Sequence, residues 1–304
     1  MAIILDTVGG NILLDNAFED DFIYAFGGDD TIVLSDDGLG DTVFAGTGDD
    51  TIEISDRTGS NTIAGGEGVD TVDYSNLGES ITLNSLGVAK ESGGFDFIDS
   101  VEVFIGATGA GIVNTIDGSS IGIVANTAFL NVDLASESLI LDGLPDGPLS
   151  VTVQNFDNVI GTQNDDIIRG DSGTNEFSGD EGDDALFGDG GDDTLDGGGG
   201  NDTLRGADNG QGEVDELTGG SGSDEFILGD AISGPLYVGG GDTDFARITD
   251  FESVDTLAFD PNTPFIDIPG TLGLGLGDRE YYWDLNANGI LDGVDDLFAV
   301  VDFA

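Results

Sequence analysis

Acidic side chains recur at a fixed short spacing in this chain, and side chains of this kind bind hard metal ions. From residue 161 the sequence reads GTQNDDIIR, GDSGTNEFS, GDEGDDALF, GDGGDDTLD and GGGGNDTLR, nine-residue units without a gap. A fixed period of this length predicts a stack of repeated turns and strands. Stacked turns rich in Gly and Asp would bring rows of carboxylates close together, and Ca²⁺ suits such all-oxygen sites.

Short strands must hold these turns in place, and each unit contains one apolar residue suited to such a strand. This residue stands two positions after an Asp or Asn: Ile168, Phe177, Leu186, Leu195 and Leu204. The pattern predicts a short strand in which this residue faces inward and its neighbours face outward. After a longer unit over residues 206–218, the phrase returns as GGSGSDEFI at residues 219–227.

A more degenerate tract of the same kind precedes this one. AFGGDDTIV (25–33), AGTGDDTIE (45–53) and GGEGVDTVD (65–73) are its clearest units. The inward apolar positions alternate between spacings of nine and eleven residues: Ile23, Ile32, Val43, Ile52, Ile63 and Val72. Alternate spacing predicts a two-sided solenoid with a longer turn along one edge. If two units make one coil, turns from units two apart stack, and their carbonyls and carboxylates can surround one ion with about six oxygens.

A second calcium motif lies near the end of the chain and is independent of the repeats. Residues 284–295 read DLNANGILDGVD, which matches a twelve-residue D-x-N-x-N-G calcium loop with Asp at the last position. Its flanks read as strands, so we expect the loop without the helices of an EF-hand. The candidate ligands are Asp284, Asn286, Asn288, Ile290 through its main chain, Asp292 and Asp295. With the repeats, this loop gives an expectation of roughly ten Ca²⁺ ions.

Charge and composition exclude several classes of function. The chain has 62 Asp plus Glu against 6 Lys plus Arg, a formal charge of −56, so nucleic acids and anionic membrane surfaces are not expected partners. It has neither Cys nor His, which removes thiol or His-based catalysis and His-ligated zinc. No apolar stretch is long enough to span a membrane. Because the hydrophobic residues are periodic, we expect a folded chain with calcium and an unfolded one without it.

The sequence divides into four segments. Residues 1–73 form the first repeat tract, and residues 161–227 form the regular one. Residues 74–160 contain two similar units of about 52 residues, with alternating apolar strands, and are interpreted as wider coils of the same solenoid. Residues 228–304 leave the pattern and contain four strand-like stretches, so we expect them to cap the open end of the roll.

These nonapeptides resemble the repeats-in-toxin (RTX) family, whose repeat is GGxGxDxUx with U large and apolar. The resemblance implies an all-β fold, a right-handed parallel β-roll with calcium in its turns. It implies side-chain ligands at Asp21, Asp30, Asp50, Asp70, Asp166, Asp184, Asp193, Asp202, Asp215 and Asp224. It implies main-chain ligands at Gly170, Gly179, Glu181, Asp183, Gly188, Gly190, Asp192, Gly197, Gly199 and Asn201.

The resemblance also carries an expectation about location and function. The family is exported by type I secretion through an uncleaved C-terminal signal, and residues 295–304 are acidic and then apolar, as such signals often are. We therefore expect a secreted, extracellular or cell-surface protein that is not an enzyme. It would be a matrix component that assembles with itself, as a filament or dimer, through an uncapped N-terminal end. The alternatives are a calcium-dependent adhesin that binds polysaccharide and an enzyme of unrecognised type within residues 74–160.

Overall fold

The computed structural model describes residues 3–5, 9–14, 20–35, 38–120, 127–145, 147–207, 212–230, 234–237, 245–259, 261–263, 265–269, 279–283 and 296–303. These residues form strands and turns, and no helix among them has the length and apolarity to cross a membrane. Contacts divide the chain into two units. The first comprises Met1–Ile121, Glu137–Ile140 and Gly147–Asn158, and the second comprises Gly122–Ser136, Leu141–Asp146 and Val159–Ala304.

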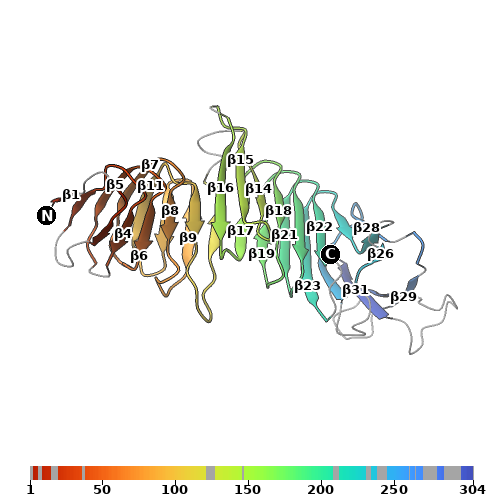
Figure 1. Ribbon diagram of the computed structural model, residues 1–304. Helices are drawn as coiled ribbons and strands as arrows, with labels where there is room; N and C mark the ends of the chain where they lie inside the picture. Colours follow the sequence, from red (N-terminus) through yellow and green to blue (C-terminus); the bar gives the residue numbers. More distant parts are fainter. Residues whose placement is uncertain are drawn as a thin grey trace. The chain divides into compact units, whose positions relative to one another are not determined.

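The first unit is built from two stacked sheets whose strands alternate along the chain. Figure 1 shows the strands of each sheet following one another as the chain coils. One sheet contains β1 (Ile3–Leu5), β3 (Phe22–Tyr24), β5 (Thr42–Thr47), β7 (Thr62–Glu67), β11 (Phe95–Asp99), β10 (Gly87–Lys90), β9 (Ile81–Asn84) and β13 (Thr115–Asp117). The other contains β2 (Ile12–Leu14), β4 (Thr31–Leu34), β6 (Thr51–Ile54), β8 (Thr71–Asp73), β12 (Val103–Ile105) and β16 (Leu149–Gln154).

Parallel pairing in register places equivalent residues of successive coils beside one another. Ile32 pairs with Ile52, and Ile52 pairs with Val72, and all three side chains are fully buried. Their threonine neighbours pair in the same register and are half-buried on the outer face. The period-2 alternation of each short strand therefore builds a continuous core from one apolar residue per turn. These sheets confirm the predicted all-β roll of largely parallel strands.

The residues interpreted as wider coils contain antiparallel as well as parallel strand pairs. In the first unit, β10 pairs antiparallel with both β9 and β11. Strand β11 then pairs parallel with β7, and β9 pairs parallel with β13. An antiparallel hairpin is therefore inserted within the sheet, and parallel stacking resumes on either side of it. Strands β15 (Ser138–Asp142) and β17 (Asn158–Ile160) each include residues of both units.

The second unit repeats the two-sheet arrangement. One sheet contains β19 (Glu176–Ser178), β21 (Thr194–Gly199), β23 (Val214–Ser221), β27 (Phe245–Phe251), β31 (Asp296–Phe303), β30 (Arg279–Trp283) and β29 (Phe265–Pro269). The other contains β14 (Phe129–Asp133), β18 (Ile167–Arg169), β20 (Ala185–Asp189), β22 (Thr203–Ala207), β24 (Glu225–Ile227) and β28 (Thr256–Ala258). A small antiparallel pair consists of β25 (Gly229–Asp230) and β26 (Gly234–Pro235).

The C-terminal segment contains the four strand stretches expected from the sequence, but the first two extend the roll. Strand β27 pairs parallel with β23, and β28 pairs parallel with β24, so they form one further coil. Strand β31 then pairs parallel with β27 and antiparallel with β30, and β30 pairs antiparallel with β29. The predicted calcium loop at residues 284–295 lies outside the described residues.

Candidate metal centre

Buried aspartates form a ladder along one edge of the second unit. Each lies directly before a strand, and its backbone N–H donates to the carboxylate of the equivalent residue one coil later. Asp166 donates to Asp184 at 2.7 Å, Asp184 donates to Asp202 at 2.8 Å, and Asp202 donates to Asp224 at 2.9 Å. These bonds use only Oδ1. Parallel in-register stacking therefore fixes the position of Oδ1 in each carboxylate. Oδ2 takes no part in this row of hydrogen bonds.

The second carboxylate oxygen points into a small space lined by oxygen atoms. The Oδ2 atoms of Asp184, Asp193 and Asp202 are buried and have no hydrogen-bond partner among the residues that the structure describes. A Cβ placed on Gly179 would collide with Oδ2 of Asp184 and with the carbonyl oxygen of Gly197. One carboxylate oxygen and one carbonyl oxygen from the next coil thus converge beside a glycine, and we call this space a turn cradle.

Turn cradles recur along both edges of the second unit. In each, the first glycine of a unit faces a side-chain oxygen five residues later and the carbonyl of a glycine from the unit two further along. The five cradles are Gly161 with Asp166 and Gly179, Gly170 with Asn175 and Gly188, Gly179 with Asp184 and Gly197, Gly188 with Asp193 and Gly206, and Gly197 with Asp202 and Gly219. The structure therefore brings together the residues that the sequence placed two units apart. Asn175 supplies an amide oxygen where the others supply a carboxylate.

Burial makes these carboxylates poor acids in the absence of a cation. Desolvation raises the pKa of Asp184 to about 8 and that of Asp193 to about 7, and neighbouring negative charges add to both effects. The pKa values of Asp166 and Asp202 rise to about 6, again mainly through desolvation. Each ladder position thus holds a carboxylate that would gain from a positive charge beside it.

The first unit carries an equivalent ladder. Asp30 donates its N–H to Oδ1 of Asp50 at 2.8 Å, and Asp50 donates to Oδ1 of Asp70 at 2.9 Å. Oδ2 of Asp50 and Oδ2 of Asp70 are buried without a hydrogen-bond partner, and Gly65 forms a cradle with Asp70 and the Ser100 carbonyl. Desolvation raises the pKa of Asp70 to about 6.

Asp21 lies in a different row from these three aspartates. Its N–H donates to Oδ1 of Asp41 at 2.7 Å, and the N–H of Asp41 donates to Oδ1 of Asn61 at 2.9 Å. This row follows the edge with the longer turns. Asp41 was not among the ligands predicted from the sequence, although Asp41-Thr-Val repeats the Asp-Thr-Ile phrase of the predicted units.

Asp215 and Asp224, two predicted ligands near the end of the regular tract, contact residues that follow that tract. Oδ2 of Asp215 accepts a hydrogen bond from the Tyr237 hydroxyl at 2.6 Å, and a Cβ on Gly206 would collide with both atoms. The tyrosine hydroxyl therefore occupies the space that forms a cradle elsewhere. Asp224 continues the ladder by donating its N–H to Asp255 at 3.1 Å.

The residues predicted as main-chain ligands divide into three groups. Gly170, Gly179, Gly188 and Gly197 belong to the cradles described above. The exposed side chains of Asp183 and Asp192 lie in two outer rows, one on each edge: Asp183 accepts the N–H of Asn201 at 2.7 Å, and Asp192 accepts the N–H of Val214 at 2.8 Å. The other three residues have backbone contacts between coils: Glu181 and Gly199 form a parallel bridge, and Gly190 donates to the Asp171 carbonyl at 3.0 Å.

Several acidic residues at these turns were missed by sequence reasoning. Asp250 accepts from the N–H groups of Gly219 and Gly220, at 2.9 and 2.8 Å. Asp255 was detectable, because Asp255-Thr-Leu repeats the Asp193-Thr-Leu phrase. The remaining missed residues, Asp56, Asp96, Glu102 and Glu213, have no such phrase around them.

The donor set of the cradles fits Ca²⁺. Within the part of the chain that the structure describes, no group of three or more acidic side chains gathers into a cluster that could hold a metal. Each cradle combines a side-chain oxygen with carbonyl oxygens of stacked turns, and this all-oxygen set is the kind that Ca²⁺ accepts. A bound ion would satisfy the unpartnered Oδ2 atoms and neutralise charge between coils.

Comparisons with known proteins agree with this chemistry. The family model "RTX calcium-binding nonapeptide repeat (4 copies)" matches residues 18–38, 36–53, 54–76, 154–186 and 178–208. A search of curated protein sequences found no significant match. The extracellular lipase LipA from Serratia marcescens is a solved structure with 12% identity and a TM-score of 0.18, a similarity too low to bear on fold or function. The match covers 94% of this chain but only 42% of the lipase. The chain carries hemolysin-type RTX calcium-binding nonapeptide repeats across much of its length.

Proposed function

We propose that this chain is a secreted structural protein that folds when Ca²⁺ fills its turn cradles. The observation that supports this function is the set of buried Oδ2 atoms without a hydrogen-bond partner among the described residues. Those of Asp70, Asp184, Asp193 and Asp202 face a carbonyl of the next coil. Asp184, Asp193 and Asp202 would hold the ion in the second unit, and Asp50 and Asp70 would do so in the first. Oδ2 of Asp166 accepts the N–H of Thr162 and is not part of this row. The ion would supply positive charge and bridge successive coils.

The charge of the chain explains why folding should depend on the ion. With a formal net charge of −56, the acidic side chains repel one another strongly in the compact state. Roughly ten ions would offset about 20 of these charges and would also satisfy the buried oxygens. Metal binding and folding are then one equilibrium, because the stacked turns that create the cradles exist only in the folded chain.

The same coupling supports an extracellular location. RTX repeats are typical of type I secreted proteins. Sites assembled from turns suit the millimolar calcium found outside cells better than the far lower cytosolic level. The chain would therefore remain unfolded inside the cell and fold after export.

Exposed apolar side chains support self-association as part of this structural role. On the first two strands, Ile3, Leu5, Ile12 and Leu14 are 63–73% exposed. In the sheet of β1, Tyr24 and Phe44 stack with ring centroids 4.9 Å apart, and Tyr24 pairs with Leu5. Burying these exposed side chains against a second copy would remove apolar surface from water. We propose a surface or matrix component that assembles through this region.

A calcium titration tests the proposed function. Calcium-free protein should lack the far-ultraviolet circular dichroism of β-sheet and should gain it as calcium is added. The number of bound ions, measured by equilibrium dialysis and elemental analysis, should rise in parallel with the sheet signal. A sheet spectrum that persists in excess chelator, or a folded protein without bound calcium, would contradict the proposal.

A further inference from the structure

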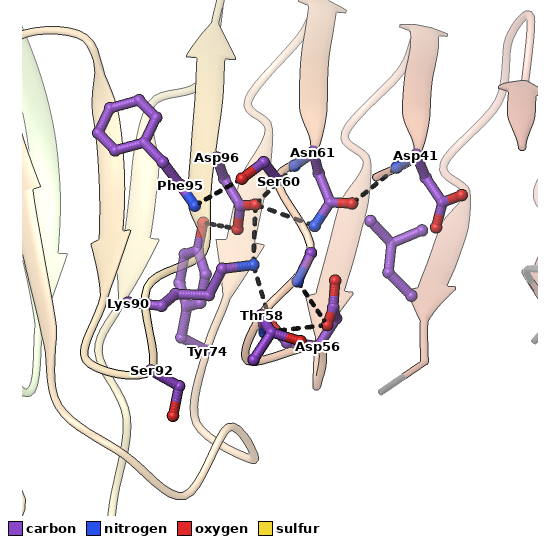
Figure 2. A network of polar contacts seen from close by, with 12 residues as sticks. Asp41, Asp56, Thr58, Ser60, Asn61, Tyr74, Lys90, Ser92, Phe95 and Asp96 are labelled. Carbon is purple, nitrogen blue, oxygen red and sulfur yellow. Dashed lines mark hydrogen bonds and ion pairs between the residues drawn. The ribbon is translucent and has the colours of Figure 1, made fainter. Parts of the chain in front are cut away.

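Lys90 is buried in the first unit and makes its polar contacts between two stacked turns (Figure 2). It ends strand β10, and its side chain is fully shielded from solvent. Its ammonium donates to Oδ1 of Asp96 at 2.9 Å and to the backbone carbonyl of Asp56 at 2.8 Å. No other lysine occurs in the chain.

The two turns that Lys90 joins belong to the long-turn edge described above. Asp96 follows Asn61 in its row, because the N–H of Asn61 donates to Oδ1 of Asp96 at 2.9 Å. The turns at residues 55–61 and 90–96 therefore stack as the Asp-bearing turns do elsewhere. Between two such turns, the rows of the second unit place a cradle of oxygen atoms.

At this point in the row the lysine side chain fills the space. A Cβ on Gly94 would meet the carbonyl oxygens of Gly59 and Arg57, which corresponds to the oxygen lining of the other cradles. It would also meet Cε of Lys90, at 2.6 Å. In the five cradles of the second unit, no cationic side chain is among the nearest atoms.

The carboxylate of Asp96 is also fully partnered, unlike its counterparts. Oδ1 accepts from Lys90 and from both the N–H and the Nδ2 group of Asn61, and Oδ2 accepts from the Tyr74 hydroxyl at 2.9 Å. By contrast, Oδ2 of Asp50 and Oδ2 of Asp70 have no hydrogen-bond partner. Asp96 thus has no oxygen left that needs an external cation. Oδ2 of Asp56, on the other turn, is buried without a hydrogen-bond partner among the described residues and lies beside the Leu39 carbonyl of the preceding coil.

We propose that the Lys90 ammonium is the resident cation of this turn pair and takes the place that Ca²⁺ takes at the other turns. This inference rests on the proposed calcium-dependent folding. A metal ion beside the buried ammonium would meet strong repulsion at low dielectric, so the turn pair excludes calcium. At the boundary between the repeat coils and the strands β9–β11, the Lys90 ammonium therefore stabilises the stacked turns. Because it is part of the chain, it is present at every calcium concentration.

Counting bound calcium in matched variants tests this assignment. Lys90→Ala removes the charge and opens space among the oxygens, so the folded variant should bind one more ion than wild type at saturating calcium. Lys90→Met removes the charge but keeps most of the volume, so it should bind no additional ion and should unfold at a lower temperature. Arg169→Ala is the control, because Arg169 forms a half-buried ion pair with Asp189 at 2.6 Å, away from the Lys90 turns, and its loss should leave the count unchanged.

The outcome separates this inference from the function on which it rests. Wild type that binds calcium, with a folded Lys90→Ala variant that binds the same number of ions, would overturn the role of Lys90 alone. Wild type that binds no calcium would overturn the proposed function and this inference with it. If Lys90→Ala fails to fold, anomalous diffraction from wild-type crystals grown in terbium decides. Metal peaks should appear at the cradles of the regular tract, and a peak bonded to Asp96 would contradict the proposal.

Discussion

The backbone N–H of Asp184 donates to Oδ1 of Asp202 at 2.8 Å, while Oδ2 of Asp202 has no hydrogen-bond partner in the described part of the chain. One carboxylate thus performs two separable tasks. Oδ1 ties a coil to its neighbour through an ordinary charge-assisted hydrogen bond. Oδ2 faces the glycine cradle and is available to a metal. A ligand substitution should therefore affect both the stacking of coils and the binding of calcium.

Asp193→Ala should destabilise the folded chain more than Asp196→Ala. Asp193 is buried, accepts the N–H of Asn175 at 2.8 Å and points its unpartnered Oδ2 into a cradle, whereas Asp196 is exposed. The calcium midpoint of folding, followed by circular dichroism, should rise for Asp193→Ala and remain near wild type for Asp196→Ala. Equal midpoints would refute the assignment of Asp193 as a ligand.

Leu195→Ala should lower stability at every calcium concentration. Leu195 is fully buried between Phe177 and Leu217 in the parallel register, so truncation leaves a cavity in the core. The expected cost is about 2–5 kcal/mol in the free energy of unfolding. Denaturant melts in saturating calcium measure this loss, and an unchanged number of bound ions would separate it from the effect of Asp193→Ala.

Tyr237→Phe should destabilise the end of the regular tract without opening a new metal site. The hydroxyl donates to Asp215 at 2.6 Å and accepts the N–H of Ala207 at 3.1 Å, and both partners are buried. Leaving a buried polar group unpaired costs about 1–3 kcal/mol. Tyr24→Phe is the matched control, because Tyr24 is half-buried on the outer face of its sheet. Thermal melts that fail to distinguish the two variants would contradict the role of Tyr237.

Acidification should favour folding of the calcium-free chain. Desolvation raises the folded-state pKa of Asp184 to about 8 and the pKa values of Asp193 and Asp215 to about 7. An unfolded Asp has a pKa of about 3.9, so between these values the folded chain binds more protons than the unfolded one. The stabilising effect is complete below pH ~4 and is lost as the pH rises through 7 and 8.

Circular dichroism of metal-depleted protein between pH 4 and 9 measures this effect. The sheet signal should be larger at the acidic end. In saturating calcium the dependence should reverse, because protons then compete with the metal for the same carboxylates. A calcium-free chain whose sheet signal grows with rising pH would contradict the buried, uncompensated state of these side chains.

Ile12→Glu should weaken self-association in calcium. Ile12 is 73% exposed on β2, and a charge there would oppose burial against a second copy. Ile167→Glu is the control, because Ile167 is also an exposed strand residue, at 45%, but lies in the second unit. Light scattering at high protein concentration in millimolar calcium compares the variants. A strictly monomeric wild-type protein would end the proposal of assembly through this region.

The repeat phrase alone determined the main features of this protein. A nine-residue period with one inward apolar residue leaves few packing solutions, so the strands, the alternation of the sheets and the aspartates before each strand could all be predicted. The nine and eleven spacing of the first tract likewise predicted the longer turns of one edge. These features are local, because each depends on residues within one or two units.

Only the tertiary structure decided which acidic side chains remain available to a metal. Tyr237 reaches Asp215 across 22 residues, and Lys90 reaches the Asp56 carbonyl across 34. Neither contact follows a period, since each arises where an irregular segment returns against a regular turn. The antiparallel strand β10 and the parallel coil formed by β27 and β28 have the same origin. Which strands pair depends on which sheet edge is still unpaired where an irregular segment meets the sheet. That edge is a property of the assembled roll rather than of any one repeat.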